Sequence, residues 1–214
     1  MEALAPSKSL VEQTYDAILE AICTGNLPPG DRLNQDELAE QLSVSRQPVN
    51  SAIAMLKAQR FVIDTGRRGV VVAPVDETLF RSIYEFRSAI EPLAVTLATA
   101  NLDAPAISEG RRIVEFGKAK VRAGDEAGVL QADIDFHGHI YALSGNDIVV
   151  DTMHLNWQHL RRSMGRVLQH PGMSAQVWDE HDRIFEAMVK GEAEAAADLM
   201  RRHVIEAPQR LRSD

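Results

Sequence analysis

Two short helical patterns joined by a three-residue turn, with a hairpin pattern directly after them, constrain the fold of this chain more than any other feature. Asn34 and Glu37 fit a capping box at the start of the first helix. Ser45 can cap the second helix, at the end of the turn over residues 43–45. Two helices joined by so short a turn cross steeply, and the second one directs its first side chains towards solvent.

The side chains at the start of the second helix suit the recognition of DNA bases. They are Ser45, Arg46, Gln47 and Asn50. Arginine and amide side chains can form paired hydrogen bonds with base edges in the major groove. We therefore expect this helix to contact double-stranded DNA.

The residues after the second helix follow the pattern of a β-hairpin with a basic tip. Apolar, strand-like runs occupy residues 61–63 and 70–72. The tip between them holds Thr65, Gly66, Arg67 and Arg68. A charged tip can simply keep a hairpin soluble, but its place after the two helices favours a wing that reaches phosphate or the minor groove. The pattern predicts a winged helix-turn-helix DNA-binding domain over residues 1–74.

The overall charge argues against a DNA-binding protein, whereas the local charge favours one. The net charge is −8 at pH 7, and residues 1–75 hold seven Lys and Arg against nine Asp and Glu. Between residues 44 and 68, however, there are five basic residues against Asp64 alone. Affinity for DNA depends on the charge that faces the phosphates rather than on the total.

Residues 75–214 are predicted to be entirely helical. Gly124, Gly145 and Gly191 separate the helical patterns, of which there are six or seven with no strand pattern among them. The first long helix carries an apolar stripe that we expect to face the core: Leu79, Ile83, Phe86, Ile90 and Leu93. The expected fold is therefore mainly α, with a winged helix-turn-helix of three helices and a hairpin followed by an all-α antiparallel bundle.

Composition and motifs favour the cytoplasm and no membrane partner. The one cysteine, Cys23, cannot form a disulfide within the chain, which fits a reducing compartment. No run reaches the roughly 18 apolar residues of a membrane span. The first ten residues lack the basic and apolar regions of a signal peptide.

Four residues of the helical half could hold a divalent metal ion. Asp133 and His137 lie one helical turn apart on one face, and His181 and His203 lie on two later helices. One carboxylate and three imidazoles suit zinc, our first expectation, and also nickel, manganese or iron. Such a pair on a helix is more often surface decoration, so spacing alone leaves both interpretations open.

Much of the chain resembles a known family. The matching segments are residues 29–34, 37–42, 44–49, 69–74, 133–137 and 144–146, with Arg87, Glu91-Pro92, Glu180-His181 and residues 200–203. Their order and spacing are similar to those of GntR-family transcription regulators of the FadR subfamily, which join a winged reader to a helical effector domain of the FCD type. The chain departs from the family at Asp36 and Asn50, where arginine is usual, so we expect an altered operator sequence.

The resemblance also implies roles for residues in the helical half. It implies that Asp133, His137, His181 and His203 bind metal, and that Arg87 grips the carboxylate of a small organic acid effector. Asn156, beside an apolar stripe, is a second effector-binding candidate. The remaining histidines, His139, His154, His159 and His170, are expected to be surface or packing residues.

Two functions compete at this point. The first is a ligand-responsive transcription regulator, expected to be a repressor, which binds a near-palindromic operator as a homodimer through residues 1–74 and binds effector and partner through residues 75–214. The second is a metal-dependent enzyme of small organic acids with a DNA-binding appendage. We identify no evident general base beside the four ligands apart from Asp135, which the helix turns roughly sideways from Asp133 and His137. We therefore favour the regulator and expect no enzyme.

Overall fold

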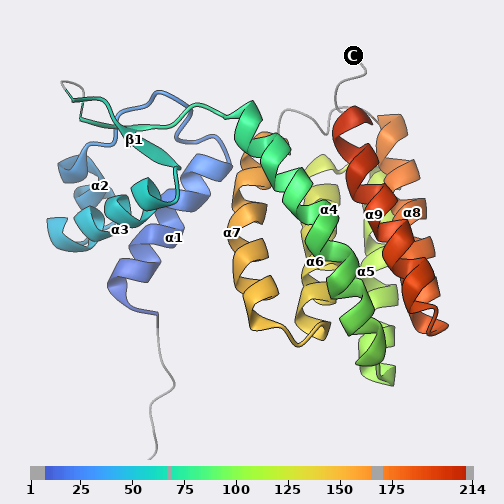
Figure 1. Cartoon of the computed structure of the whole chain (residues 1–214). Helices are drawn as coiled ribbons and strands as arrows, with labels where there is room; N and C mark the ends of the chain where they lie inside the picture. Colours follow the sequence, from blue (N-terminus) through green and yellow to red (C-terminus); the bar gives the residue numbers. More distant parts are fainter. Residues whose placement is uncertain (1–7, 67–68, 165–170, 211–214) are drawn as a thin grey trace, which may run out of the picture. The chain divides into compact units, whose positions relative to one another are not determined.

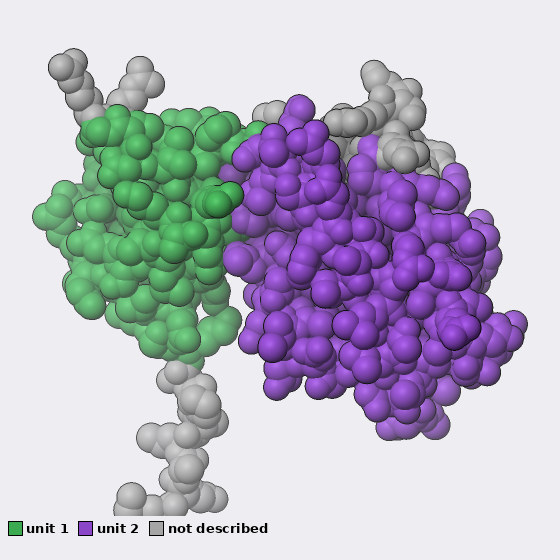
Figure 2. Space-filling view, viewed as in Figure 1, with its two compact units in different colours: residues 1–75 green, residues 76–214 purple. Residues whose placement is uncertain are grey.

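The computed structural model describes residues 8–66, 69–164 and 171–210. The chain divides into two compact units, residues 1–75 and residues 76–214, which are coloured separately in Figure 2. Within the described ranges, no helix combines the length and the apolar content that a membrane crossing needs.

The first unit is the predicted winged helix-turn-helix (Figure 1). Its elements are α1 (Leu10–Cys23), α2 (Gln35–Gln41), α3 (Arg46–Ala58), β1 (Val62–Asp64) and β2 (Val70–Val72). The two strands pair antiparallel, with Val62 opposite Val72. The segment before α2 joins the hairpin through an isolated bridge between Arg32 and Val71. Val62 and Val72 are fully buried, as is Leu56 of α3, so the hairpin packs on the same core as the helices.

The helix starts of this unit differ in detail from the expected caps. Asn34 does cap α2, accepting a hydrogen bond from the backbone N–H of Asp36 at 3.0 Å. Glu37, however, accepts from the side-chain amide of Asn34 and so does not complete the expected capping box. Ser45 occupies the N-cap position of α3, but its side chain makes no capping hydrogen bond. The hydroxyl of Ser45 is therefore available to a ligand at the start of α3.

The second unit is a bundle of six helices within the described residues (Figure 1). They are α4 (Glu77–Ala100), α5 (Ala104–Ala123), α6 (Glu126–Leu143), α7 (Asp147–Met164), α8 (Pro171–Val189) and α9 (Ala193–Arg210). Asp103, Asp125 and Asn146 cap α5, α6 and α7 with their side-chain oxygens. Gly124 ends α5 with a left-handed backbone (φ 65°), which glycine adopts without strain.

The buried face of α4 differs from the expected apolar stripe. Ile83 is buried, but Phe86 and Leu93 are 38% and 46% exposed. The face that meets the core is rotated by about one residue and carries Arg87 and Glu91, which are 2% and 0% exposed. Leu79, Ile83 and Ile90 do pack on the core, so the expectation was wrong only for Phe86 and Leu93. A stripe drawn from apolar residues alone omits a charged pair that lies in the centre of the bundle.

Two glycines of α5 allow α8 to approach closely. A Cβ atom added to Gly110 would lie 2.0 Å from the ring of Phe185, and one added to Gly117 would lie 2.1 Å from the ring of Trp178. Both aromatic residues are buried, and Trp178 packs edge-on against His181, with ring centroids 4.8 Å apart. The contact between α5 and α8 therefore fixes the part of α8 that carries His181.

Candidate functional site

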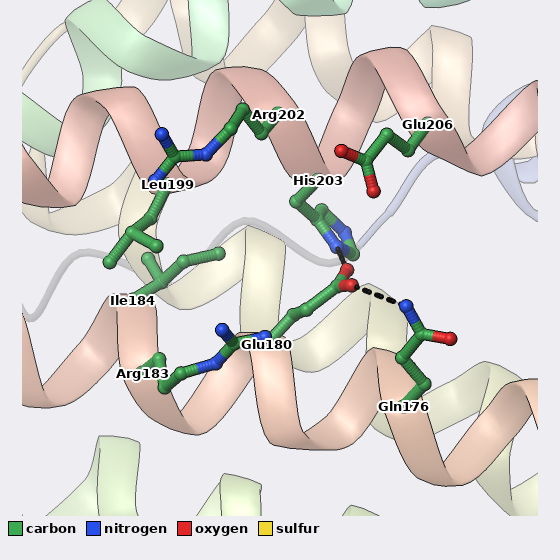
Figure 3. Close-up of a pocket in the computed structure, with 8 residues that line it drawn as sticks. All are labelled: Gln176, Glu180, Arg183, Ile184, Leu199, Arg202, His203 and Glu206. Carbon is green, nitrogen blue, oxygen red and sulfur yellow. Dashed lines mark hydrogen bonds and ion pairs between the residues drawn. The ribbon is translucent and has the colours of Figure 1, made fainter.

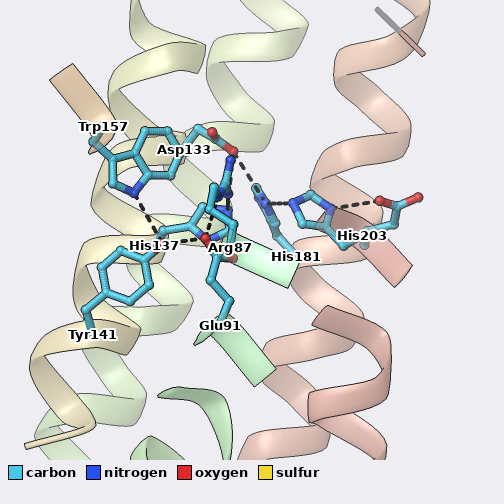
Figure 4. Close-up of polar contacts among 9 residues, drawn as sticks. Arg87, Glu91, Asp133, His137, Tyr141, Trp157, His181 and His203 are labelled. Atoms are coloured by element: carbon cyan, nitrogen blue, oxygen red, sulfur yellow. Dashed lines mark hydrogen bonds and ion pairs between the residues drawn. The ribbon is translucent and has the colours of Figure 1, made fainter. Parts of the chain in front are cut away.

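Three histidines from three helices meet inside the second unit (Figure 4). His137 lies on α6, His181 on α8 and His203 on α9. Each offers one ring nitrogen, and these atoms lie within 4.8 Å of one another. His137 and His181 are 0% exposed and His203 is 5% exposed. Neighbouring imidazole nitrogens shielded from water in this way could hold a metal ion.

Asp133 completes this group. It lies one turn before His137 on α6, and its Oδ1 is 3.4 Å from Nε2 of His181 and 3.9 Å from Nε2 of His137. The Nε2 atoms of His181 and His203 are 3.2 Å apart. The structure thus brings together all four residues that the sequence singled out, with the Nε2 atoms on the inner side of the cluster.

Two further carboxylates support the histidines from outside. Oε2 of Glu91 lies 3.1 Å from Nδ1 of His137, and Oε2 of Glu180 lies 2.9 Å from Nδ1 of His203. Histidines that bind metals commonly donate the second ring N–H to such a carboxylate, which fixes the tautomer and the ring orientation. Nδ1 of His137 and Nδ1 of His181 are both buried without a hydrogen-bond partner in the described residues. His203 is therefore oriented by a carboxylate as metal ligands usually are, and His137 has a carboxylate at ion-pair distance.

Burial keeps the imidazoles of His181 and His203 in the form that binds metals. Burial, together with His203 and His137, holds the pKa of His181 well below its usual value. Burial also lowers the pKa of His203, although the hydrogen bond to Glu180 opposes this shift. Neutral imidazoles are the ligating form, so these residues need release no proton to bind an ion at neutral pH. Three imidazoles and one carboxylate fit zinc, nickel, manganese or iron.

Arg87 lies next to this cluster and is held in place on all sides. Its Nε donates to Oε1 of Glu91 at 2.5 Å, and its Nη2 lies 3.4 Å from Nε2 of His137. The guanidinium carbon is 4.9 Å from the ring centroid of Tyr84 and 4.7 Å from that of Trp157. A guanidinium fixed between two rings in this way could bind a planar, anionic group beside the histidines.

Glu91 connects Arg87 to the histidine cluster. Its Oε1 accepts hydrogen bonds from Arg87 and, at 2.6 Å, from the hydroxyl of Tyr141, and its Oε2 lies at ion-pair distance from Nδ1 of His137. Burial alone would raise the pKa of Glu91, but Arg87 and His137 outweigh it and hold the pKa well below its usual range. Glu91 is therefore an ionised carboxylate in the interior of the bundle, in contact with three side chains. Tyr84, which packs on Arg87, stays neutral, because burial raises its pKa to about 12.

Sequence reasoning gave no role to several of these residues. Glu91 and Glu180 appeared only as parts of the family motif. Glu91 lies four positions after Arg87, and Glu180 lies one position before His181. Trp157, rather than the neighbouring Asn156, contacts Arg87 and also donates to Tyr141 at 3.2 Å. Asn156 is half-buried on α7 and makes none of the polar contacts that join the cluster. The stacking of Trp157 on an arginine of another helix has no signal in the sequence.

The other histidines of the described residues, and Asp135, are not part of the cluster. Nε2 of His139 is 3.0 Å from the carbonyl oxygen of Ala106, and His154 is exposed. His159 is half-buried, and His170 lies outside the described residues. Asp135 is exposed and accepts a hydrogen bond from Gln131 at 2.9 Å, so it faces solvent rather than the cluster.

The first unit exposes the predicted reading residues at the start of α3. Ser45, Arg46, Gln47 and Asn50 are all exposed. Nε of Arg46 pairs with Oδ1 of Asp36 on α2 at 2.8 Å, and both side chains are 65% exposed. An ion pair this exposed contributes little to stability. The carboxylate of Asp36 does, however, lie where Arg46 would meet DNA.

The wing tip is described only in part. Thr65 and Gly66 are exposed, and Thr65 closes the tip with a backbone hydrogen bond to the carbonyl of Gly69 at 2.9 Å. The predicted phosphate contacts Arg67 and Arg68 lie outside the described residues.

Comparisons with known proteins match each of the two units to a known family. Residues 10–72 match the model of bacterial regulatory proteins of the gntR family, and residues 82–206 match that of the FCD domain. An HTH-type transcriptional regulator in an unstable DNA locus of Streptomyces ambofaciens is 29% identical, over 89% of this chain and 80% of its own length. The HTH-type transcriptional regulator YdhC of Bacillus subtilis is 26% identical, over 89% and 86% of the two chains.

Solved structures show the same fold. Escherichia coli McbR/YncC superposes with a TM-score of 0.82 at 21% identity, covering 96% of this chain and 98% of that one. A GntR-type transcriptional regulator from Rhodococcus superposes with a TM-score of 0.80 at 24% identity, covering 97% and 100%.

Proposed function

The chain belongs to the GntR family of DNA-binding transcription regulators and carries an FCD domain, and from this we propose that it is a repressor controlled by a small carboxylate ligand bound beside a metal ion. The winged unit would read the operator, and the helical bundle would bind the ion and the effector. We place the protein in the cytoplasm, where its DNA would be.

The observation that carries the effector proposal is the position of Arg87 beside the histidine cluster. Nη2 of Arg87 lies 3.4 Å from Nε2 of His137, and both residues are buried. Asp133, His137, His181 and His203 would hold the ion, which would supply an electrophilic partner for an anionic oxygen. A carboxylate could then meet the ion with one oxygen and Arg87 with the other. This arrangement would select small organic acids that lack a second bulky group, because the site is buried.

We propose zinc as the first ion to test, followed by nickel, manganese and iron. The donor set of three imidazole nitrogens and one carboxylate oxygen supports all four. The ligands come from α6, α8 and α9, so an ion would connect helices that are distant in sequence. Binding energy of that kind stabilises the folded state and would make the bundle more rigid.

The exposed surface of the winged unit supports recognition by a pair of chains. The reading residues occupy only the first turns of α3, and Arg46 is already paired with Asp36. Among these described reading residues, Arg46 is the one cation presented to the DNA of a half-site. A homodimer doubles these contacts and makes the operator a near-palindrome. Effector binding would regulate such a dimer if the ligand favours one placement of the two readers over another.

Arg46→Ala is expected to weaken operator binding by about 1–3 kcal/mol if Arg46 reads a base edge. Fluorescence anisotropy with operator DNA and with scrambled DNA at matched salt measures this loss. If Arg46 contacts only phosphate, binding should fall equally on both DNAs and the salt dependence should drop by about one unit. The matched variant Asp36→Asn should move affinity in the opposite direction, because it releases Arg46 and removes a negative charge. Unchanged binding by both variants would refute the assignment of α3.

A metal-dependent enzyme is the second candidate, and one observation weighs against it. Asp135, the base suggested by the sequence, is exposed and bonded to Gln131 rather than directed at the histidines. A metal that only grips a chelating acid needs no such base. Turnover of small organic acids by the metal-loaded protein would support the enzyme instead.

A further inference from the structure

A surface pocket between α8 and α9 reaches the outer side of the histidine cluster (Figure 3). Its volume is about 330 Å³, and its walls include Gln176, Glu180, His203 and Glu206, together with the two arginines Arg183 and Arg202. His203 is thus a member of the buried cluster and also part of the pocket wall. The other two histidines of the cluster are fully buried and do not line this pocket.

Glu180 lies between this pocket and His203. Its Oε2 accepts from Nδ1 of His203 at 2.9 Å, and its Oε1 accepts from the side-chain amide of Gln176 at 3.3 Å. An ionised carboxylate can only accept, so Nδ1 of His203 must carry the proton. The lone pair of His203 is then on Nε2, which lies 3.2 Å from Nε2 of His181 on the inner side of the cluster. Glu180 therefore selects the tautomer in which His203 can bind an ion inside.

The two outer carboxylates differ in their access to solvent. Glu91 is 0% exposed and accepts hydrogen bonds from Arg87 and Tyr141, so its carboxylate contacts only interior groups. The side chain of Glu180 is 12% exposed and lines the pocket. Arg183 and Arg202 also line the pocket, so the carboxylates of Glu180 and Glu206 are what would attract a cation to it, and Glu180 is the one bonded directly to His203.

We propose that Glu180 is a positioning residue of the metal centre, which orients His203 for an ion and controls exchange of that ion through the pocket between α8 and α9. This inference rests on the metal site of the proposed function. Loss of an outer carboxylate of this kind typically lowers metal affinity 10–100-fold. Glu180→Gln keeps the size of the side chain and removes its charge, so it tests the electrostatic part of the role without opening a cavity.

The experiment compares the full-length wild type with Glu180→Gln in zinc competition against a chromophoric chelator. We expect the dissociation constant of the variant for zinc to rise roughly 10–100-fold. The rate of zinc release into excess chelator should rise with it, and the visible absorption bands of the cobalt-loaded variant should shift. The melting temperature of the variant in chelator should match that of the wild type. A lower melting temperature without metal would instead indicate a purely structural role for Glu180.

Glu206→Gln is the matched control, because it removes the same charge from the wall of the same pocket. It should leave zinc affinity, release rate and the cobalt spectrum as in the wild type. Equal losses in Glu206→Gln and Glu180→Gln would show a general charge effect and overturn the proposal. Wild-type affinity in Glu180→Gln would overturn it while leaving the metal centre intact. Failure of the wild type itself to bind any of the four metals would refute the metal centre and the proposal together.

Discussion

Glu91→Gln is expected to lower the free energy of unfolding by about 3–5 kcal/mol, the usual cost of breaking a buried ion pair from one side. Glu91 and Arg87 are 0% and 2% exposed, and Oε1 of Glu91 lies 2.5 Å from Nε of Arg87. The amide of the variant leaves the guanidinium buried without a counter-charge. Chemical denaturation in the presence of a chelator measures this cost without any contribution from bound metal.

The same helix supplies a matched control. Arg81 and Glu85 have the same four-residue spacing as Arg87 and Glu91, but their side chains are 62% and 70% exposed. Glu85→Gln should change the free energy of unfolding by no more than about 0.5 kcal/mol. If Glu91→Gln is equally mild, Arg87 is not held by a buried charge and cannot be preorganised as we describe.

A double substitution separates stability from function. Arg87→Met with Glu91→Leu replaces the pair by apolar side chains and should recover part of the stability lost in Glu91→Gln. The rest is the cost of the buried hydroxyl of Tyr141, which loses its acceptor. It should still abolish any response to a carboxylate, because the guanidinium is gone.

His181→Gln and His203→Gln are each expected to abolish the stabilisation that zinc gives the wild type. An ion present at 100 times its dissociation constant stabilises the folded state by about 2.7 kcal/mol. For a chain of this size, that corresponds to a rise in Tm of about 5–11 °C. The difference between Tm with zinc and Tm with chelator is the quantity to compare, because it cancels the cost of altering a buried side chain.

His154→Gln is the control for this series, since His154 is exposed and distant in sequence from the ligands. It should retain the full zinc-dependent rise in Tm and one metal ion per chain by elemental analysis. A zinc-dependent rise that survives in His181→Gln or His203→Gln would place the ion elsewhere.

The fold could be predicted from the sequence because its signals are local. Gly124 and Asn146 mark helix ends through backbone conformation and side-chain capping, which depend on a few neighbouring residues. The face of α4 could not be predicted in this way. Arg87 and Glu91 are buried because Tyr84, Tyr141 and Trp157 surround them, and two of these three residues lie on other helices.

The candidate site shows the same division. Asp133 and His137 lie one turn apart, so their proximity follows from helix geometry. His181 and His203 were candidates because they lie on two later helices, and the resemblance to the family supported them; the packing of α8 and α9 brings them within reach. The outer carboxylates Glu91 and Glu180 depend on which faces of α4 and α8 meet the cluster, and no spacing in the sequence contains that information.

The most direct test of the central proposal is operator affinity measured with and without a small carboxylate ligand, in metal-loaded and in metal-depleted protein. A panel of organic acids would first be screened for a rise in Tm of the zinc-loaded chain. We predict that an acid from this screen changes operator affinity at least about tenfold, a coupling of about 1.4 kcal/mol, and only when the metal is present. Metal-depleted protein that keeps its stability and responds to the same acid to the same extent would contradict the account.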